Sequence, residues 1–346
     1  MPRLNNLPTR PLGKNGPLIP RIGLGLMAAS GTYGAPLSET EHLTFLDEVY
    51  NRGETFWDTA DKYTDSEAIL GKWFAMNPSK REDIFLATKF GICTAPEGTQ
   101  TGKKYWMDST PEYCRAALER SLTRLGLPYV DLYYIHRLDK VTPIEKTIEA
   151  MVQLKKEGKI RFLGLSECSA ESLRRAHAIH PITCVQVEYS IFCREIESPR
   201  VGLLEVAREL GVAVVAYSPL GNGVLGGGIR SREDVAGPGD SRGVLPWLRE
   251  GNIEVNVAVV DRIAAMARKK GVTTAQLALA WLLAQGDDVF PIPGTRRVER
   301  LEENLGSLGV ELLGGEEGEM RRLAERVVGG RFQALTGFDF ADTPVL

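Results

Sequence analysis

The sequence lacks any strong imbalance of charge. Its 346 residues include 42 lysines and arginines against 45 aspartates and glutamates, a net charge of −3. Without an excess of positive charge the surface offers no general attraction for a polyanion, and we expect no nucleic acid partner.

Long apolar runs are also missing. No stretch approaches the roughly 20 consecutive apolar residues that a membrane-spanning helix needs, so we expect no membrane partner. Residues 1–10 contain Pro2 and Pro8 and no apolar segment of the kind found in a signal peptide. We therefore expect a cytoplasmic protein.

The sequence contains few cysteines, and their spacing does not form a recognisable motif. The five cysteines are odd in number, scattered, and contain no Cys-x-x-Cys spacing. This usage is typical of reduced thiols in a cytosol, and we expect neither a zinc site nor another metal site.

The sequence does contain a repeated pattern of predicted helices and strands. A segment of helical period ends at a glycine, which readily adopts the left-handed conformation just past a helix, and a β-rich run follows. The predicted strands are residues 22–26, 55–58, 84–88, 129–135, 160–165, 183–187, 212–217 and 289–292. The predicted helices are residues 39–52, 66–74, 110–125, 143–157, 170–178, 202–210, 274–284 and 297–305.

Eight strands alternating with eight helices predict an α/β fold, a (β/α)₈ TIM barrel that takes up residues 1–346 as a single domain. The expected additions are an N-terminal hairpin (residues 10–12 with 18–21), extra helices at 256–270 and 316–327, and long loops on the C-terminal face of the barrel. The structural competitor is a doubly wound sheet, which is disfavoured because no Gly-x-Gly-x-x-Gly turn opens a predicted helix.

Polar side chains fall where the predicted strands end. In a barrel the C-terminal strand ends face the active site, so these side chains are expected at one rim. The residues are Asp58, Lys89, His136, Ser166 with Glu167, Gln186 with Glu188, and Tyr217 with Ser218. Each one alone could be an ordinary polar residue at a strand–loop boundary. Tyr63 follows Asp58 closely, so a carboxylate and a phenol could share a proton-transfer site there.

These strand ends also carry short motifs, in a fixed order along nearly the whole chain. The motifs are Gly53-x-x-Phe56-x-Asp58-Thr59-Ala60-x-x-Tyr63, Ala87-Thr88-Lys89, Tyr134-Ile135-His136, Gly164-Leu165-Ser166, Val185-Gln186-Val187-Glu188-Tyr189, Ala216-Tyr217-Ser218-Pro219-Leu220-Gly221, and Ile292-Pro293-Gly294-Thr295-Arg296 with Glu303-Asn304. In this set the sequence resembles the aldo-keto reductase family. The resemblance implies an NADPH-dependent reductase on a (β/α)₈ barrel, with no metal, whose catalytic tetrad would be Asp58, Tyr63, Lys89 and His136.

The chemistry of these four residue types agrees with carbonyl reduction, which needs a proton on oxygen as well as a hydride on carbon. A tyrosine can donate that proton when a neighbouring ammonium favours the phenolate, and Asp58 would keep Lys89 charged and oriented. His136 would donate to the carbonyl oxygen and stabilise the developing negative charge. Taken singly, His136 could be a structural hydrogen-bonding residue and Lys89 a surface lysine or a Schiff-base former.

The resemblance also implies a cofactor site across the barrel mouth. Ser166, Glu167 and Gln186 would hold the nicotinamide carboxamide and Tyr217 would stack on the ring, while Glu167 stands where the family commonly has Asn and can accept a hydrogen bond but not donate one. The other cofactor residues expected from the resemblance are Gly25, Leu26, Met27, Asp58, Ser218, Pro219, Leu220, Gly221, Gly223, Gly294, Thr295, Arg296, Arg300, Glu303 and Asn304.

The arginines of residues 294–304 favour NADPH over NADH, because phosphate binds well at a helix N-terminus flanked by arginine. The alternative is a solvated arginine face on an amphipathic helix. Substrate choice is expected to rest on residues 91–109, 222–251 and 331–346, whose aromatics could cap a pocket for a medium-sized apolar or aromatic carbonyl. The aromatics and neighbours in question are Tyr105, Trp106, Trp247, Phe332, Phe338 and Phe340 beside Met27, Tyr33 and Trp57.

Two other functions remain open from the sequence. One is an NADPH-binding regulatory protein of the same fold with little turnover, and the other is a barrel lyase or aldolase in which Lys89 forms an imine. The physiological carbonyl, the favoured direction and the oligomeric state are not indicated by the sequence.

Overall fold

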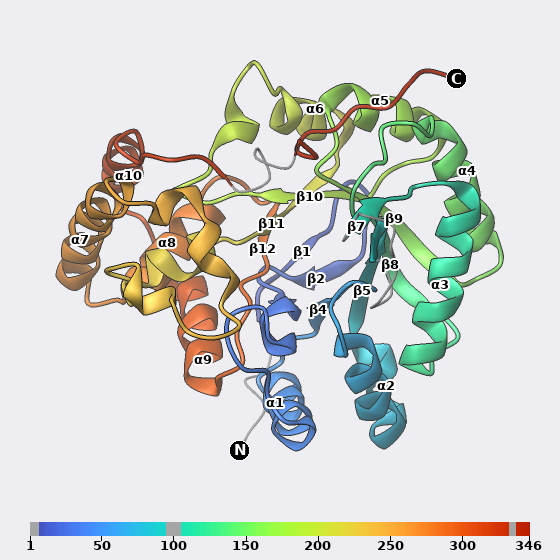
Figure 1. The fold of residues 1–346 in the computed structure, drawn as a ribbon, viewed down its shortest axis with the longest axis horizontal. Helices are drawn as coiled ribbons and strands as arrows, with labels where there is room; N and C mark the ends of the chain where they lie inside the picture. The colour runs from blue at the N-terminus through green and yellow to red at the C-terminus, as the bar shows by residue number, and fades with distance from the viewer. Residues whose placement is uncertain (1–6, 95–104, 332–336) are drawn as a thin grey trace.

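The computed structural model describes residues 7–94, 105–331 and 337–346. In these residues eight parallel strands form one sheet, ringed by helices (Figure 1). In spatial order the strands are β3 (Leu24–Gly25), β4 (Phe56–Asp58), β5 (Phe85–Phe90), β8 (Val130–Ile135), β9 (Ile160–Ser166), β10 (Cys184–Glu188), β11 (Ala213–Tyr217) and β12 (Val289–Pro291). The predicted α/β barrel is therefore confirmed.

The sheet closes between its first and last strands. Gly25 and Gly294 form an isolated parallel bridge, and the Gly23 amide donates to the Pro291 carbonyl oxygen over 2.9 Å. A Cβ on Gly25 would lie only 2.8 Å from the Ile292 carbonyl oxygen, so this close approach requires glycine. Closure removes the open edges of the sheet and brings all strand ends to two common rims.

Helices return the chain between successive strands, and their ends carry recognisable caps. The side chain of Ser38 caps α1 in a capping box with Glu41, and Thr110 caps α3 just before a proline in the first turn. The helices of the ring are α1 (Glu39–Asn51), α2 (Ser66–Met76), α3 (Pro111–Leu125), α4 (Ile144–Lys156), α5 (Ala170–Ile179), α6 (Leu203–Leu210), α8 (Thr274–Leu283) and α9 (Val298–Gly306). Two further helices extend the ring: α7 (Asn252–Lys270) packs against α8, and α10 (Glu316–Ala324) packs against α7 (Figure 1).

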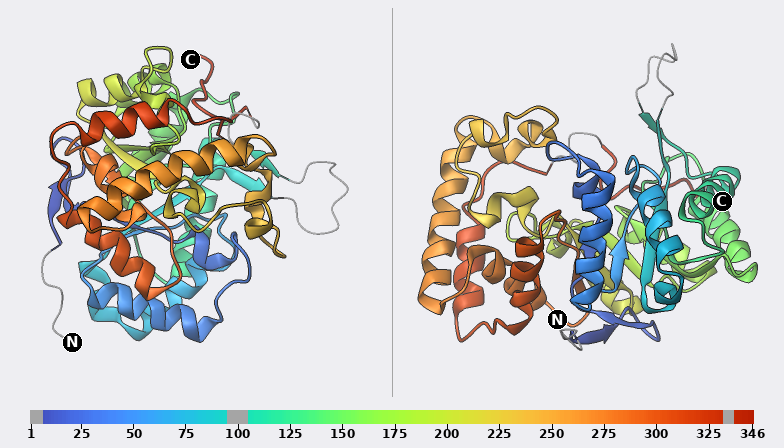
Figure 2. Two further views of the ribbon diagram at one scale, coloured as in Figure 1. Left: turned by 90° about the vertical axis from the view of Figure 1, so that its left-hand side faces the viewer. Right: turned by 90° about the horizontal axis from the view of Figure 1, so that it is seen from below.

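The inside of the barrel is a small apolar core of its own. It joins inward-facing strand residues such as Phe56, Leu132 and Phe290 to Leu12 and Ile19 of the N-terminal hairpin. That hairpin pairs β1 (Thr9–Pro11) with β2 (Leu18–Pro20) and covers one end of the barrel (Figure 2). The N-terminal rim is thereby sealed, and the functional site is left to the other rim.

A larger apolar core lies between the outer face of the strands and the surrounding helices. β8 is buried along its whole length, in keeping with a sequence that is apolar or aromatic except at Asp131, which is ion-paired with Arg81 and Arg161. Trp57 belongs to this outer core, where its ring centroid lies 4.8 Å from that of Trp73.

Some local structure differs from the sequence expectation. Within residues 91–109, β6 (Ile92–Thr94) and β7 (Tyr105–Met107) pair as an antiparallel hairpin beyond the C-terminal rim. The long loop after β11 folds into 3₁₀ turns, η4 (Gly221–Gly226), η5 (Glu233–Val235), η6 (Ser241–Val244) and η7 (Pro246–Leu248). Short turns of this kind carry no clear period in the sequence. No helix in the described parts of the chain combines the length and apolarity that a bilayer crossing requires.

Candidate active site

Three of the four predicted tetrad side chains are joined by hydrogen bonds at the C-terminal rim. The Lys89 Nζ, fully buried on β5, lies 2.5 Å from Oδ1 of Asp58 at the end of β4. The same Nζ donates to the Thr59 carbonyl oxygen over 2.7 Å and to the Tyr63 hydroxyl over 3.3 Å. The lysine therefore links the carboxylate to the phenol.

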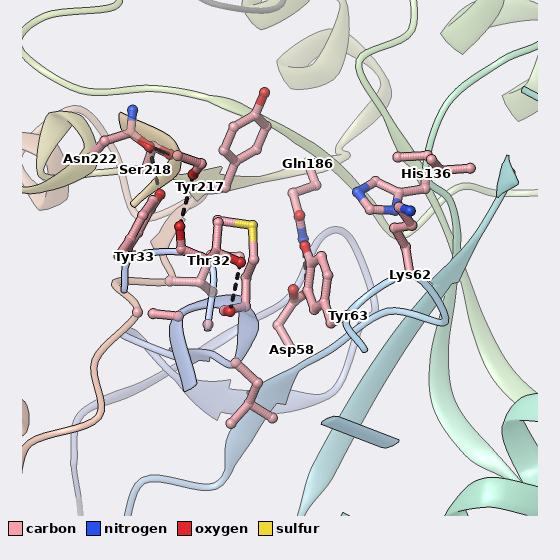
Figure 3. A pocket seen from close by; sticks show the side chains of 18 of the residues that line it. Thr32, Tyr33, Asp58, Lys62, Tyr63, His136, Gln186, Tyr217, Ser218 and Asn222 are labelled. Atoms are coloured by element: carbon pink, nitrogen blue, oxygen red, sulfur yellow. Dashed lines mark hydrogen bonds between the residues drawn. The ribbon is translucent and has the colours of Figure 1, made fainter. Parts of the chain in front are cut away.

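Tyr63 reaches this position from the loop between β4 and α2. A turn fixes the loop, in which the Tyr63 amide donates to the Ala60 carbonyl oxygen and Ser66, the first residue of α2, donates to the Tyr63 carbonyl oxygen. The phenol is brought back over the strand ends toward Lys89, and Figure 3 shows it beside Asp58 and Gln186 in the cavity.

His136 completes the group directly after β8. Its ring centroid lies 5.9 Å from that of Tyr63, and the two rings meet edge to face at 85°. Burial, followed by the charges of Arg137 and Lys89, lowers the pKa of His136 well below its ordinary value of 6.5. The imidazole is therefore neutral near pH 7, with one N–H to donate.

The Asp58–Lys89 pair is held in its charged form. Burial lowers the pKa of Lys89, but the charges and hydrogen bonds of Asp58 and Tyr63 raise it by more, so the pKa lies above 10.5. Burial raises the pKa of Asp58 against the opposing contacts from Lys89 and Gln186. With an ammonium at 2.5 Å from one carboxylate oxygen and the Gln186 amide donating to the other over 2.8 Å, we assign the carboxylate as ionised.

A cavity of about 850 Å³ opens above this group (Figure 3). Its wall contains Asp58, Tyr63 and His136, and also most of the strand-end and loop residues expected at a cofactor. Those residues are Gly25, Leu26, Met27, Gln186, Tyr217, Ser218, Pro219, Leu220, Gly223 and Gly294. Among the described residues, no cluster of three or more His, Cys, Asp or Glu side chains could hold a metal ion.

The sequence matches the profile of the Aldo/keto reductase family over residues 21–324. The chain belongs to this family. As a member it is an oxidoreductase that acts on carbonyl groups and the corresponding alcohols.

Curated relatives agree over the full length. The chain is 44% identical to the aldo-keto reductase str7 of Strobilurus tenacellus, covering 98% of this chain and 99% of that protein. It is 43% identical to the aldo-keto reductase yakc [NADP(+)] of Schizosaccharomyces pombe, with 98% of each covered. The glycerol dehydrogenase AKR11B4 of Gluconobacter oxydans has a similar structure, with a TM-score of 0.79 and 28% identity over 92% of this chain and 95% of that one.

Several cofactor residues predicted from the family resemblance lie outside the wall of this cavity. Arg300 and Glu303 line a separate depression of about 630 Å³ at the start of α9, where the Arg300 guanidinium pairs with the Glu303 carboxylate at 2.5 Å. The Arg296 guanidinium donates to the Ala35 carbonyl oxygen, and the Thr295 hydroxyl accepts from the Arg297 amide. Gly221 and Asn304 are buried nearby.

Ser166 ends β9 and Glu167 directly follows it, but neither residue lines the cavity. Glu167 is fully buried, and its carboxylate accepts from the Tyr217 hydroxyl over 2.9 Å and from the Glu188 amide over 3.1 Å. It also forms an ion pair with the Arg331 guanidinium. Both oxygens of this carboxylate are thus engaged within the protein, which the sequence alone did not indicate.

Arg331 does not line the cavity, but it holds Glu167 in an ion pair that the sequence analysis did not predict. It is buried in the C-terminal tail, and its guanidinium lies 4.7 Å from the centre of the Phe340 ring and 3.7 Å from the Glu188 carboxylate. Burial raises the pKa of Glu188 to about 8, against the opposing charge of Arg331. No local pattern marks Arg331, because its partners come from strands β9 and β10 far upstream.

Arg137 was missed too, although its signal was available, since it directly follows His136 at a strand end. It lines the cavity, as do Thr32, Lys62, Asn222 and Arg242.

Of the expected substrate-side residues, Met27, Tyr33, Tyr105 and Phe338 line the cavity. Trp57 and Trp247 are instead fully buried packing residues, Trp106 lies outside the cavity wall, Phe340 packs on Arg331, and Phe332 is outside the described residues.

Proposed function

We propose that this chain catalyses the reversible reduction of an aldehyde or ketone to an alcohol with NADPH, and that Tyr63 is the proton donor. The observation that carries the proposal is the position of Lys89, whose Nζ contacts both the Asp58 carboxylate and the Tyr63 hydroxyl at the edge of the cavity. Family membership supplies the reaction class.

The proton transfer follows from these contacts. The Tyr63 oxygen accepts a hydrogen bond from Lys89, so its own hydrogen is free to point into the cavity toward a carbonyl oxygen. After the proton leaves, the adjacent ammonium stabilises the phenolate, and Asp58 keeps that ammonium charged. Neutral His136 donates a second hydrogen bond to the same carbonyl oxygen and stabilises its developing charge.

The residues present fit a nicotinamide dinucleotide. Gly25, Gly223 and Gly294 lie along the cavity wall, and Gly223 has a φ of +97° that favours glycine. Arg297 and Arg300 line the depression at the start of α9, a place suited to a 2′-phosphate. NADPH, when bound, supplies the hydride. The S. pombe relative carries NADP(+) in its name, which supports the same coenzyme here.

The substrate side of the cavity favours a medium-sized apolar or aromatic carbonyl compound. Tyr33, Ile92, Tyr105, Met107 and Phe338 contribute apolar and aromatic surface around the polar group formed by Tyr63 and His136. An apolar body would contact these side chains while its carbonyl oxygen meets the two donors.

The deciding experiment follows the absorbance of NADPH against a panel of aldehydes and ketones, for the wild type and for Tyr63→Phe. We expect the variant to lose at least about a hundredfold in kcat, since a general acid contributes roughly 10²–10⁴-fold. The affinity for NADPH should stay close to that of the wild type, because Phe keeps the ring.

Other outcomes assign the chain differently. Retained turnover in Tyr63→Phe would remove Tyr63 from the acid role. NADPH binding without turnover of any carbonyl by the wild type would favour the regulatory function. Trapping of a carbonyl ligand on Lys89 by borohydride would favour the lyase or aldolase.

A further inference from the structure

Arg137 stands out among the buried cations of the chain. It is 8% exposed, and it lines the cavity directly after His136. Among the described residues, no carboxylate lies within 4.0 Å of its guanidinium, whereas the equally buried Arg81 and Arg331 each contact one. A buried cation at a cavity wall without an anionic partner offers its remaining N–H groups to whatever enters the cavity.

The hydrogen bonds that Arg137 does make fix its position. Its Nη1 donates to the His136 carbonyl oxygen over 2.7 Å and to the Ser166 hydroxyl oxygen over 3.1 Å. Ser166 is paired in register with Gln186 on the next strand, so the hydrogen bond to Ser166 places the Arg137 guanidinium beside the ends of β9 and β10. The guanidinium carbon also lies 6.0 Å from the centre of the Tyr217 ring.

Gln186 offers a hydrogen-bond acceptor to the same cavity, whereas Arg137 offers donors. Its amide nitrogen donates to the Asp58 carboxylate, which as an ionised group is an acceptor only, and this contact fixes the orientation of the amide. The amide oxygen is then left to accept. Between them Arg137 and Gln186 offer one donor group and one acceptor at the cavity wall.

A carboxamide has the complementary pair, a carbonyl oxygen that accepts and an NH₂ group that donates. We propose that Arg137 is the positioning residue that donates to the carbonyl oxygen of the nicotinamide carboxamide, while the Gln186 oxygen accepts from its NH₂ group. Glu167 cannot serve as the donor, because its carboxylate is taken up by Tyr217, Glu188 and Arg331. This inference rests on the NADPH-dependent function proposed above.

The test measures the binding of three probes to wild type and to Arg137→Met, which keeps the apolar stem and removes the donors. The probes are NADPH, a thionicotinamide analogue of NADP whose sulfur is a weak acceptor, and 2′,5′-ADP, which has no nicotinamide. We expect the Kd for NADPH to rise about ten- to a hundredfold, as for a lost hydrogen bond to a charged group. The Kd for 2′,5′-ADP should be unchanged, and that for the thio analogue should change much less than that for NADPH.

A matched variant, Arg137→Lys, separates charge from geometry. Lysine keeps the cation but not the planar fork, so it should recover only part of the NADPH affinity. In wild type alone, the thio analogue should already bind more weakly than NADP, a comparison that stands even where Arg137→Met folds poorly. A wild type that binds the thio analogue and NADP equally well overturns the proposal.

Two further results would also overturn it. Equal losses for NADPH and 2′,5′-ADP would mean that Arg137 only supports the fold. Unchanged NADPH affinity, with a higher KM for 4-carboxybenzaldehyde but not for benzaldehyde, would assign Arg137 to a substrate carboxylate. A wild type that neither binds NADPH nor reduces carbonyls would instead contradict the proposed function itself, so the two failures are distinguishable.

Discussion

At the scale of single residues, the Asp58–Lys89 pair combines a functional role with a structural cost. Both side chains are almost fully buried, and each compensates the charge of the other. Removing one partner leaves a buried charge without compensation, whereas removing both leaves none.

We therefore predict that Lys89→Met destabilises the protein by about 3–5 kcal/mol. The double variant Asp58→Asn/Lys89→Met should recover a large part of that loss, although neither variant should turn over substrate. Urea denaturation of the wild type, both single variants and the double variant provides the measurement. Strictly additive losses would show that the two side chains are not coupled.

His136 leads to a prediction about pH. Its pKa is lowered well below 6.5 in the folded protein, whereas the unfolded chain takes up this proton near 6.5. As the pH falls below about 6.5 the unfolded state binds more protons, so folding stability should decline. The reduction rate should show no decline near pH 6.5 from this imidazole.

His42 also has a lowered pKa, so the comparison needs a variant that isolates His136. His136→Gln should lose less stability than the wild type between pH 7.5 and pH 5.5, measured as urea midpoints. An acid limb near pH 6.5 in kcat/KM that is absent from His136→Gln would contradict a neutral His136.

At the scale of elements, the strands and helices were predictable and the loops were not. Glycine just past several of the helices and buried β-rich runs placed all eight barrel strands, because both signals are local. The contacts of Glu167 were not predictable, since Arg331 lies 164 residues further along the chain. Trp57 shows the same limit, because a residue beside the site in sequence points outward into the helix layer.

The predicted preference for NADPH over NADH can be tested at the start of α9. Among the described residues, Arg300 is part-exposed and forms an ion pair with Glu303 one turn further along α9, so its guanidinium can turn to a phosphate at little cost. We expect Arg300→Ala to raise the KM for NADPH about tenfold or more while changing that for NADH little, as the loss of one charge-assisted contact implies. Steady-state kinetics with both coenzymes is the check, and equal effects on the two would argue against contact with a 2′-phosphate.

At the scale of the whole molecule, the barrel separates stability from chemistry. The β1–β2 hairpin seals one end with Leu12 and Ile19, and the candidate site occupies the other. That the entire chain is one domain stays a prediction. The division predicts that changes at the sealed end alter folding without altering catalysis.

Ile19→Ala tests this division against a neighbour on the same strand. Ile19 is 2% exposed and Leu18 is 69% exposed, so the two adjacent side chains face opposite ways. We expect Ile19→Ala to cost about 2–5 kcal/mol in the free energy of unfolding and Leu18→Ala about 0.5 kcal/mol or less. Both should keep wild-type kcat/KM per folded molecule, and a large drop for Ile19→Ala would show that the two ends are coupled.

The ion pair between Arg331 and Glu167 has a consequence for the order of events during synthesis. The acid emerges from the ribosome 164 residues ahead of the cation that neutralises it. Until Arg331 has been synthesised, burial of the Glu167 carboxylate would leave its negative charge without a compensating cation. We therefore expect the rim formed by β9, β10 and β11 to stay open on the nascent chain. Accordingly, we expect the part of the rim around Glu167 to be completed in the last stage of translation, after most of the barrel has left the exit tunnel.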